Sequence, residues 1–355
     1  IFSGTKQNHN KIIDSSLLEA QEPLDEFNSL KGNDLFISKA NANNLKNIDV
    51  SFKLNAINVV CGVSGSGKTS LLRDVLYQSY KNKNASNCAT IQGFSLINDL
   101  QWVSVRSGIL NQQSVASYFG LWDEIRKHFA NQQKAKELGF KSIDFSLNSK
   151  ANQCPTCKGQ GIHIVKLDFL NDINSLCESC GGSGFTQNIL QVKYKEKSIS
   201  EILHLTIDEV LNLFISDNVL FKKLALIQKI GLSYLKLNQK LKQLSHGEYQ
   251  RARLIHQIMN TQLNNTVFVF DEPSKGLSQK DLKYLFELFS LLIKSNSSII
   301  IIEHKPELIK RADYILELGP GAGNEGGNLI FQGVFIDLLK NKSSKTAEYF
   351  KSNDL

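Results

Sequence analysis

A glycine-rich segment near residue 65 has the residue types and spacing of a phosphate-binding loop. Gly62-Val63-Ser64-Gly65-Ser66-Gly67-Lys68-Thr69 matches the pattern G-x-x-x-x-G-K-[ST] without a mismatch. Its glycines let backbone N–H groups surround phosphate oxygens, and the N-terminus of a following helix adds partial positive charge. Lys68 would reach the β- and γ-phosphates, and the Thr69 hydroxyl would hold Mg²⁺. The sequence therefore predicts a site for a nucleoside triphosphate and Mg²⁺.

Two carboxylates follow a second apolar segment and could complete this site. Val267–Phe270 predicts a buried strand that ends at Asp271 and Glu272. Asp271 would hold Mg²⁺, and Glu272 would be the general base for an attacking water molecule. A further apolar run, Ile299–Ile302, leads to His304. Because ligands of open α/β sheets bind at the carboxyl ends of the strands, we expect His304 to reach the γ-phosphate.

Four of the six cysteines have the spacing of a metal site. Cys154-x2-Cys157 and Cys177-x2-Cys180 are separated by nineteen residues, and glycines follow each pair. This spacing is typical of four-cysteine zinc sites, and the glycines allow backbone N–H groups to turn toward the sulfurs. A closed shell of four sulfurs favours structural Zn²⁺ over catalytic Zn²⁺. Its binding free energy, of order 10–16 kcal/mol in isolated peptides, would decide whether the module folds.

A short polar segment, Leu244-Ser245-His246-Gly247-Glu248, opens a predicted helix. Ser245 is a candidate N-cap, and Glu248 stands three residues later. A capping box, with no further function, is therefore one explanation of this segment.

These groups need rigid elements to position them, and the chain's periodicity predicts strands that alternate with helices. The expected strands are Leu35–Ser38, Ile48–Phe52, Ile57–Cys61, Thr266–Phe270, Ser298–Ile302 and Tyr314–Leu318. The expected helices are Thr69–Tyr80, Lys280–Ile293 and segments within 111–150 and 200–237. Lys81–Asn98 is rich in Asn and is expected to be a loop. A strand, a glycine-rich turn and a helix in succession begin an α/β unit.

The predicted fold class is α/β, with a nucleotide-binding core interrupted by a large insertion. We divide the chain into a linker over 1–30 and a first part of the core over 31–110. An inserted region follows over 111–200, with the cysteine module at 154–184. A helical segment and the second part of the core occupy 201–355.

Composition limits the classes of protein that the chain can belong to. The chain has 355 residues, 41% of them hydrophobic, and a net charge of 41 − 34 = +7. No apolar run approaches the roughly twenty residues of a membrane span, and no signal peptide is evident, so we expect a cytoplasmic protein. Cysteines in a reducing compartment favour metal binding over disulfides. Cys61 is expected in the core, and Cys88 as a free thiol. Because the first residue is Ile, the chain is expected to be a piece of a longer protein.

These motifs, in this order, resemble the ATP-binding cassette family, whose signature reads Leu-Ser-Gly-Gly-Glu/Gln. The resemblance implies a phosphate-loop core that binds ATP. It also implies that Ser245 and Gly247 contact ATP bound to a second cassette. The sequence departs from the family at His246, where the family has glycine.

The four-cysteine module lies upstream of the signature segment, and in this the chain resembles the UvrA family in particular. The resemblance is to the carboxyl-terminal half of the proteins of that family. Further matching segments are Asn43–Asp49, Asp123–Arg126, Gly276-Leu277, Ile302–His304 and Leu318–Gly321, and Ser3-Gly4 resembles the end of a preceding cassette. The resemblance implies ATP hydrolysis coupled to binding of double-stranded DNA, with damage found by the deformability of the duplex, as in nucleotide excision repair. It implies a second cassette, in the same longer chain or in a homodimer. It also implies a UvrB-like partner that docks on the family's first half, and no membrane.

One further departure leaves alternatives open. Arg106 stands where the family has a glutamine that senses Mg²⁺ and the attacking water; it cannot ligate a cation but could contact phosphate. With His246, this leaves open the alternative of a divergent UvrA-like paralogue that acts in resistance to DNA-binding drugs and hydrolyses ATP weakly at this site, although the intact Lys68, Asp271, Glu272 and His304 oppose weak hydrolysis. The ATPase subunit of a membrane transporter is a third alternative, although it has no reason to carry the cysteine module.

Candidate DNA contacts are lysines in and after the cysteine module. They are Lys158, Lys166, Lys193, Lys195 and Lys197, with Tyr194 among them. A solvated lysine face is the alternative.

Overall fold

The computed structural model describes residues 34–104, 113–167 and 170–353. The predictions for the first thirty residues and for Arg106 lie outside these ranges. Among the described helices, none is both long enough and apolar enough for a membrane crossing.

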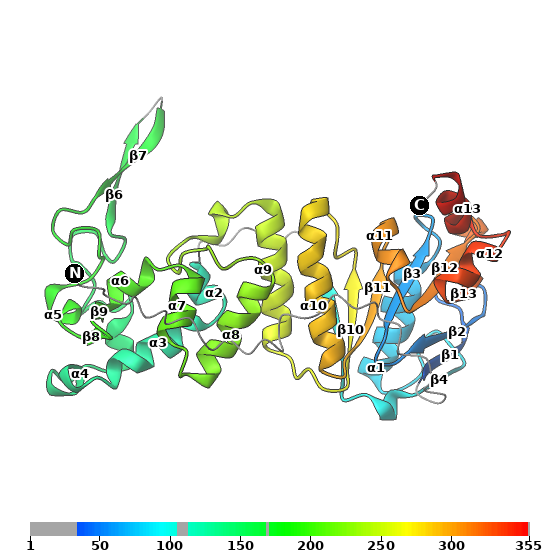
Figure 1. The fold of residues 1–355 in the computed structure, drawn as a ribbon, viewed down its shortest axis with the longest axis horizontal. Helices are drawn as coiled ribbons and strands as arrows, with labels where there is room; N and C mark the ends of the chain where they lie inside the picture. Colours follow the sequence, from blue (N-terminus) through cyan, green and yellow to red (C-terminus); the bar gives the residue numbers. More distant parts are fainter. Residues whose placement is uncertain (1–33, 105–112, 168–169, 354–355) are drawn as a thin grey trace, which may run out of the picture. The chain divides into compact units, whose positions relative to one another are not determined.

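The centre of the fold is a mostly parallel β-sheet with the strand order β13-β12-β3-β11-β10-β5 (Figure 1). Its strands are β3 (Ile57–Gly62), β5 (Asp99–Ser104), β10 (Thr266–Asp271), β11 (Ser298–Ile302), β12 (Tyr314–Gly319) and β13 (Asn328–Gly333). Only β13 pairs antiparallel within this sheet, with β12. The predicted α/β class is confirmed. Strands β5 and β13 were not predicted.

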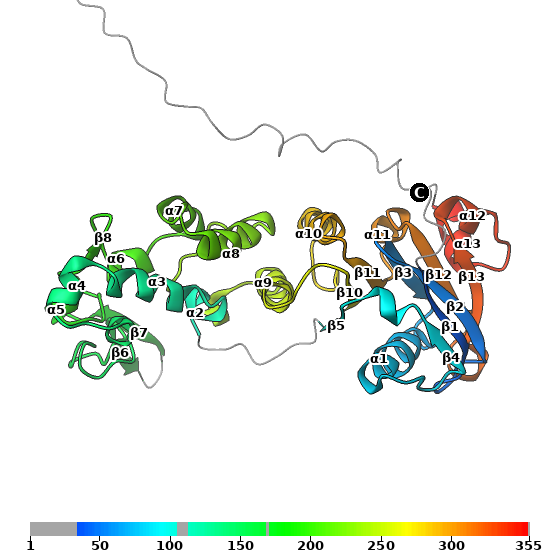
Figure 2. The ribbon, with the colours of Figure 1, turned by 90° about the horizontal axis from the view of Figure 1, so that it is seen from below.

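Alternate residues of the central strands face two different cores, because successive side chains of a strand point to opposite faces. Phe268 and Phe270 of β10 pack in the core that includes helix α10 (Leu282–Lys294). Val267 and Val269 pack in the core that includes the helix after the phosphate loop. Figure 2 shows α10 and α11 on one side of the sheet and α1 on the other.

A small antiparallel sheet of order β2-β1-β4 lies beside the helix that follows the phosphate loop. Its strands are β1 (Asp34–Ala40), β2 (Ile48–Lys53) and β4 (Thr90–Gln92), and the helix consists of a π-helical part η2 (Ser70–Tyr77) and α1 (Gln78–Asn82). The expectation of a loop over Lys81–Asn98 is wrong for β4, which pairs with β1 through Phe36 and Gln92. This strand depends on a partner more than fifty positions away, so local composition could not indicate it.

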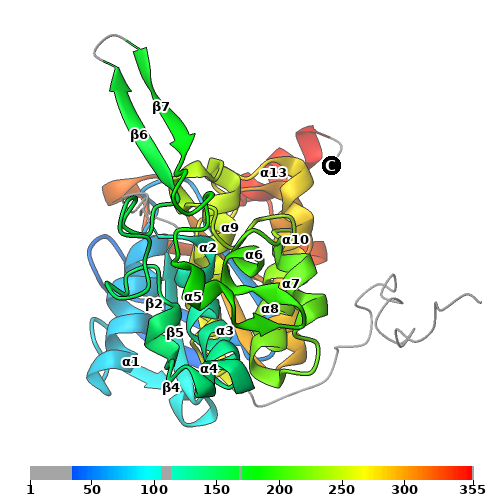
Figure 3. The same cartoon turned by 90° about the vertical axis from the view of Figure 1, so that its left-hand side faces the viewer.

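Residues 113–259 form the helical and cysteine-bearing part. Its helices are α2 (Val115–Tyr118), α3 (Leu121–Ala130), α4 (Gln133–Glu137), α5 (Gln187–Leu190), α6 (Ile199–Leu203), α7 (Ile207–Leu213), α8 (Asn218–Lys229) and α9 (His246–Met259). The segment Leu205–Phe214 contributes to the core, where it buries Ile207, Val210 and Phe214. Two hairpins complete this part: β6 (Ile162–Leu167) with β7 (Leu170–Leu176), and β8 (Lys193–Tyr194) with β9 (Lys197–Ser198). Figure 3 shows the longer hairpin, which was not predicted from the sequence.

The chain ends with helices α11 (Pro306–Lys310), α12 (Phe335–Lys340) and α13 (Lys345–Ser352). Glu317 of β12 holds the start of α13, because its carboxylate accepts hydrogen bonds from the Ser344 hydroxyl and from the backbone and hydroxyl of Thr346. Short 3₁₀ turns lie at Phe94–Leu96, Ser142–Phe145, Leu241–Gln243, Gln279–Asp281 and Gly323–Glu325.

Candidate nucleotide site and cysteine module

The phosphate loop leaves strand β3 at Gly62 and enters helix η2 after Thr69, as the motif requires. Gly62 has a φ of +125°, and a Cβ built there would lie 2.0 Å from the carbonyl oxygen of Leu318 on the neighbouring strand. Only glycine fits this position, because any side chain would collide with the backbone of β12. The loop therefore starts from a tightly packed pair of strands.

Lys68 is nearly buried and already has oxygen partners within the loop. Its ammonium donates hydrogen bonds to the carbonyl oxygens of Gly62 at 2.9 Å and Val63 at 2.8 Å. Burial lowers the pKa of Lys68 from its usual value, and the nearby Cys61 and Glu272 act in the opposite direction. Cys61, predicted as a core residue, is fully buried, and burial raises its pKa to about 12. A neutral buried thiol fits a packing role for Cys61.

Asp271 and Glu272 stand at the carboxyl end of β10, two strands from the phosphate loop. Asp271 pairs in register with Ile302 of β11, and the backbone N–H of Glu272 donates to the carbonyl of Ile302 at 3.1 Å. Glu272 has a φ of +50°, which is uncommon for a residue with a side chain. The hydrogen bond from Lys275, at 2.8 Å, is the largest cause of the lowered pKa of Glu272, and the charge of Lys275 acts in the same direction.

His304 follows β11, which lies between β3 and β10. Burial lowers its pKa from the usual histidine value, and the positive charge of Lys68 lowers it further, so the imidazole is neutral at pH 7. Glu272 also acts on the pKa of His304, and His304 and Lys68 act on that of Glu272. The fold therefore places Lys68, Glu272 and His304 in one electrostatic neighbourhood at the carboxyl edge of the sheet.

Residues far away in the sequence brace the outer side of the phosphate loop. The side-chain amide of Asn44 donates to the carbonyl oxygens of Gly65 and Gly323, each at 3.0 Å. The backbone N–H groups of Gly323 and Gly327 donate to the carbonyls of Gly65 and Ser66, each at 3.0 Å. A Cβ on Gly327 would lie 1.8 Å from the carbonyl oxygen of Asn44.

This brace was missed by sequence reasoning. Asn44 lies in the segment Asn43–Asp49, which matches the UvrA family, but no local pattern indicates its contacts with Gly65 and Gly323. Five glycines lie within Gly319–Gly327, more than a single turn needs. That number could have indicated a close approach to another backbone segment.

Ser245 begins helix α9 and forms the predicted capping box. Its hydroxyl accepts from the backbone N–H of Glu248 at 3.3 Å, and the Glu248 carboxylate accepts from the backbone N–H of Ser245 at 2.7 Å. Helix α9 packs on α8 and on β5, the edge strand of the sheet. The N-terminal end of α9 lies against the segment that follows β10, since a Cβ on Gly247 would lie 3.7 Å from Oδ2 of Asp281 and 3.9 Å from Cδ2 of Leu277. The phosphate loop follows β3, which is two strands away from β10.

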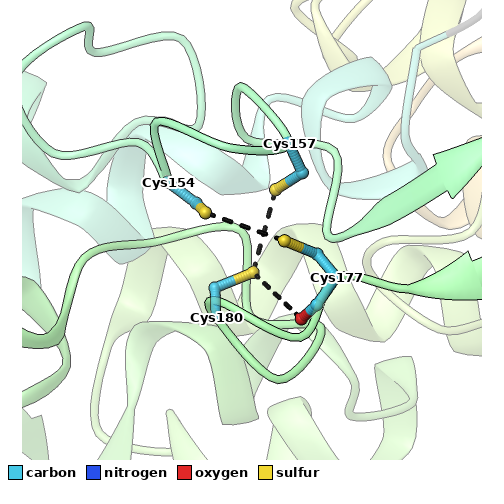
Figure 4. A group of neighbouring side chains, drawn as sticks. All are labelled: Cys154, Cys157, Cys177 and Cys180. Carbon is cyan, nitrogen blue, oxygen red and sulfur yellow. Dashed lines mark hydrogen bonds between the residues drawn. The ribbon is translucent and has the colours of Figure 1, made fainter.

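The four predicted metal-ligating cysteines lie together and point toward one another (Figure 4). All four are buried, and their sulfurs lie within 4.8 Å of one another. The Sγ atoms of Cys154 and Cys177 are 3.9 Å apart, and those of Cys157 and Cys180 are 3.7 Å apart. The N–H groups of two glycines donate to sulfur: Gly161 to Cys157 at 3.1 Å, and Gly184 to Cys180 at 3.4 Å.

These distances fit a tetrahedral zinc site. A Zn–S bond of about 2.3 Å implies sulfurs about 3.8 Å apart in a tetrahedron. The two N–H···S hydrogen bonds stabilise thiolates, which are the form that binds Zn²⁺. The donor set is therefore suited to Zn²⁺ in both geometry and chemistry. Cys88, by contrast, is a partly exposed free cysteine in a loop, as expected.

The candidate DNA-contacting lysines have different surroundings. Lys193 forms an ion pair with Glu201 at 3.0 Å. Lys195 donates to the carbonyl of Leu213, the last residue of α7, at 2.6 Å. Tyr194, which lies between these two lysines in the sequence, stacks on the ring of Phe214 and packs against the core. The remaining candidates are Lys158, which is exposed, Lys197, which is partly buried, and Lys166, whose side chain lies outside the described residues.

Comparison with known proteins gives consistent matches over nearly the whole chain. No protein-family model matches it. It is 36% identical over 330 residues to the UvrABC system protein A of Clostridium tetani, which corresponds to 90% of this chain and 35% of that protein. It is 36% identical over 322 residues to the UvrABC system protein A of Staphylococcus aureus, covering 89% of this chain and 34% of that protein. The crystal structure of UvrA2 from Deinococcus radiodurans matches with a TM-score of 0.77 and 32% identity, covering 95% of this chain and 42% of that chain. The chain thus spans about a third of the length of the curated relatives it matches.

Proposed function

The chain is homologous to the UvrA family over about nine-tenths of its length, and from this premise we propose that it is an ATPase that binds double-stranded DNA. We further propose that it recognises distorted or damaged duplex, as nucleotide excision repair requires. One observation carries the ATPase part of the proposal. The phosphate loop with Lys68, then Glu272 and His304, follow β3, β10 and β11, three neighbouring parallel strands whose carboxyl ends lie at one edge of the sheet.

The charge states of these residues suit ATP hydrolysis. The N–H groups of the phosphate loop and the ammonium of Lys68 would bind the triphosphate. Glu272 is ionised at neutral pH, so its carboxylate can accept a proton from an attacking water molecule. The neutral His304 can donate a hydrogen bond to the γ-phosphate. Thr69 and Asp271 supply the hydroxyl and carboxylate oxygens that Mg²⁺ prefers, and Mg²⁺ would neutralise phosphate charge there.

The cysteine module is proposed to hold one structural Zn²⁺ ion. The convergence of four buried sulfurs at tetrahedral spacing supports this proposal. All four coordination positions would be filled by sulfur, so no position remains for a substrate or an attacking water. The module would therefore shape the surface around it rather than catalyse a reaction.

The nucleotide site is proposed to be completed by a second cassette, in a homodimer or in a longer chain. The N-terminal end of α9 lies beside the segment that follows β10, two strands from the chain's own phosphate loop, and this supports the proposal. These residues would contact ATP bound to the other cassette. A UvrB-like partner would bind through the family's first half. The transporter alternative leaves the four-cysteine cluster unexplained.

Hydrolysis is tested by Glu272→Gln in the full chain. We expect ATP to bind with unchanged affinity and turnover to fall by roughly a hundredfold or more, because the general base is removed. The control is Glu287→Gln on the exposed face of α10. Turnover of Glu272→Gln equal to that of the control would show that Glu272 is not the base.

DNA binding is tested by filter binding of damaged and undamaged duplexes, with and without ATP. We expect tighter binding of the damaged duplex and a steep loss of affinity with salt, about 0.9 log units per phosphate contact for each tenfold rise. Lys158→Ala should reduce this slope, whereas Lys193→Ala, which removes an ion-paired lysine, should reduce it less. Equal and salt-independent affinity for both duplexes would contradict the proposal.

A further inference from the structure

The N-terminal end of helix α9 packs on the loop that follows Glu272. Gly276 in that loop has a φ of +78°, and a Cβ built on it would lie 2.5 Å from Cδ2 and 2.6 Å from Nε2 of His246. The imidazole of His246 therefore covers the face of Gly276 where any other residue would carry a side chain. This contact belongs to the one signature position at which the sequence departs from the glycine of the cassette family.

Gln250 holds the same loop one helical turn later. It lies four positions after His246, so both side chains are on one face of α9. Its side-chain amide donates to the carbonyl of Pro273 at 3.0 Å, and only 2% of the residue is exposed. Its Oε1 is buried, accepts no hydrogen bond from the described residues, and would lie 3.2 Å from a Cβ on Gly276. Two residues of α9 thus contact the loop Pro273–Gly276 at both of its ends.

The loop is also tied to the proposed catalytic groups. Lys275 forms an ion pair with Glu272. The backbone N–H of Ser274 donates to the carboxylate of Glu303 at 3.3 Å, and the other oxygen of that carboxylate accepts from the N–H of His304 at 2.9 Å. Displacement of this loop would therefore move the partners of both Glu272 and His304.

We propose that His246 is a positioning residue that fixes the loop Pro273–Gly276, and through it the Glu272 carboxylate, against helix α9 of the same chain. This inference rests on the proposed ATPase function. With glycine at position 246, the space over Gly276 would be open, and the loop would sample more conformations. His246 thus acts within its own chain, and not as a direct contact to phosphate bound by a second cassette.

A double-mutant cycle in the full chain tests this inference, with the variants His246→Gly, Gly276→Ala and their combination. His246→Gly should lower kcat by roughly tenfold to a hundredfold, because a misplaced catalytic group is costly, and should leave KM for ATP within about twofold. His246→Gln keeps a side chain of similar bulk over Gly276 and should restore most of the kcat. Gly276→Ala should lower kcat and the urea midpoint in the natural chain, because the new methyl group collides with the ring of His246. It should lower them less in the His246→Gly variant, where that ring is absent.

The cycle is followed by kcat and KM and, separately, by the urea midpoint of unfolding. An increase of KM with unchanged kcat would overturn the inference, because it would indicate a contact with bound nucleotide. Strict additivity of the two substitutions in both kcat and the urea midpoint would also overturn it. If the natural chain shows no ATP turnover, the proposed function fails. The urea midpoints then decide whether His246 and Gly276 are coupled: coupling supports the contact, and additivity rejects it.

Discussion

The phosphate loop and the cysteine module are both built from glycine-rich turns, but different forces hold them in shape. The phosphate loop is held by hydrogen bonds from distant segments, such as those from Asn44 and Gly323. It also adjoins a core of branched apolar side chains from η2, β10 and β11. Among the described residues, the module's own buried cluster consists of its four cysteines. The fold therefore organises the first site in advance, whereas the second requires an ion at its centre.

The two sites should respond differently to the loss of a single group. In the phosphate loop, each hydrogen bond is one of several, and the surrounding core remains when one is removed. In the module, the loss of one sulfur removes most of what brings the two turns together, because thiols have little attraction for one another without a metal. Three substitutions, from the largest expected effect to the smallest, can break or sharpen this difference.

Cys177→Ser is expected to have the largest effect. Zinc binding contributes of order 10–16 kcal/mol in isolated zinc-binding peptides, so loss of one thiolate should release the ion and unfold the segment between Cys154 and Gly184. The remainder of the fold should persist, because its cores do not include the module. Metal analysis should find one zinc per natural chain and almost none in the variant, and limited proteolysis should cut within the module.

Cys88→Ser is the matched control, since this cysteine is free and partly exposed. It should keep its zinc and its resistance to proteolysis. If the Cys177→Ser chain keeps a protease-resistant module without zinc, the two cysteine turns are stable without metal. The module would then resemble the phosphate loop, which protein contacts hold in place.

Asn44→Ala is expected to have an intermediate effect. It removes the two hydrogen bonds that join Gly65 to Gly323 and leaves two carbonyl oxygens without that donor. The expected cost is about 1–3 kcal/mol in the free energy of unfolding, with weaker ATP binding because the loop is less constrained. Urea denaturation and a fluorescent ATP analogue would measure the two effects.

Asn43→Ala provides a control at the neighbouring position. Asn43 is exposed and donates to the side chains of Ser70 and Asp74 on the surface of η2. Its loss should cost less in the free energy of unfolding and leave the affinity for ATP unchanged. If both variants bind ATP equally, the Asn44 brace does not constrain the loop.

The sequence predicted those parts of the site whose residues are neighbours along the chain. The phosphate loop, the carboxylates after β10 and the cysteine pairs each follow from a short motif, and β11 begins and ends where apolar periodicity placed it. Asn44, which braces the loop from 279 positions before Gly323, has no local motif to mark it. Strand β4 was missed because its partner β1 lies more than fifty positions away. The hairpin β6–β7 was missed as well, although Ile162 and Ile164 of β6 flank the polar His163.

The lysines after the module show a second limit of sequence reasoning. A cluster of lysines at Lys193 and Lys195 indicates positive charge, but charge alone does not say whether a side chain is available to a partner. In the structure, Lys193 pairs with Glu201, and Lys195 caps the end of α7. Both contacts depend on how the hairpin β8–β9 packs against helices, which composition does not reveal.

Glu201→Gln is expected to have the smallest effect. It tests the contribution of a helix cap, because Glu201 and Ser198 form the capping box of α6. The Ser198 hydroxyl, which donates to the Glu201 carboxylate, is the largest cause of a pKa of about 2 for Glu201, below the ordinary 4.5. The ionised form is therefore favoured in the folded state. Its contribution is fully present above about pH 4.5 and is lost as the pH falls toward 2. Because 57% of this side chain is exposed, solvent screening limits the loss to under about 1 kcal/mol.

The measurement is the difference in urea midpoint between the natural chain and Glu201→Gln across this pH range. It should be constant near neutral pH, shrink below pH 4.5 and vanish near pH 2. Glu209→Gln, in the equivalent capping box with Thr206, is the matched comparison. It should behave in the same direction with a smaller amplitude, because no lysine in the described part of the chain forms an ion pair with Glu209 as Lys193 does with Glu201. A midpoint difference that does not depend on pH would mean that the cap acts through shape rather than charge. The helix ends would then be held as the phosphate loop is, by hydrogen-bond geometry alone.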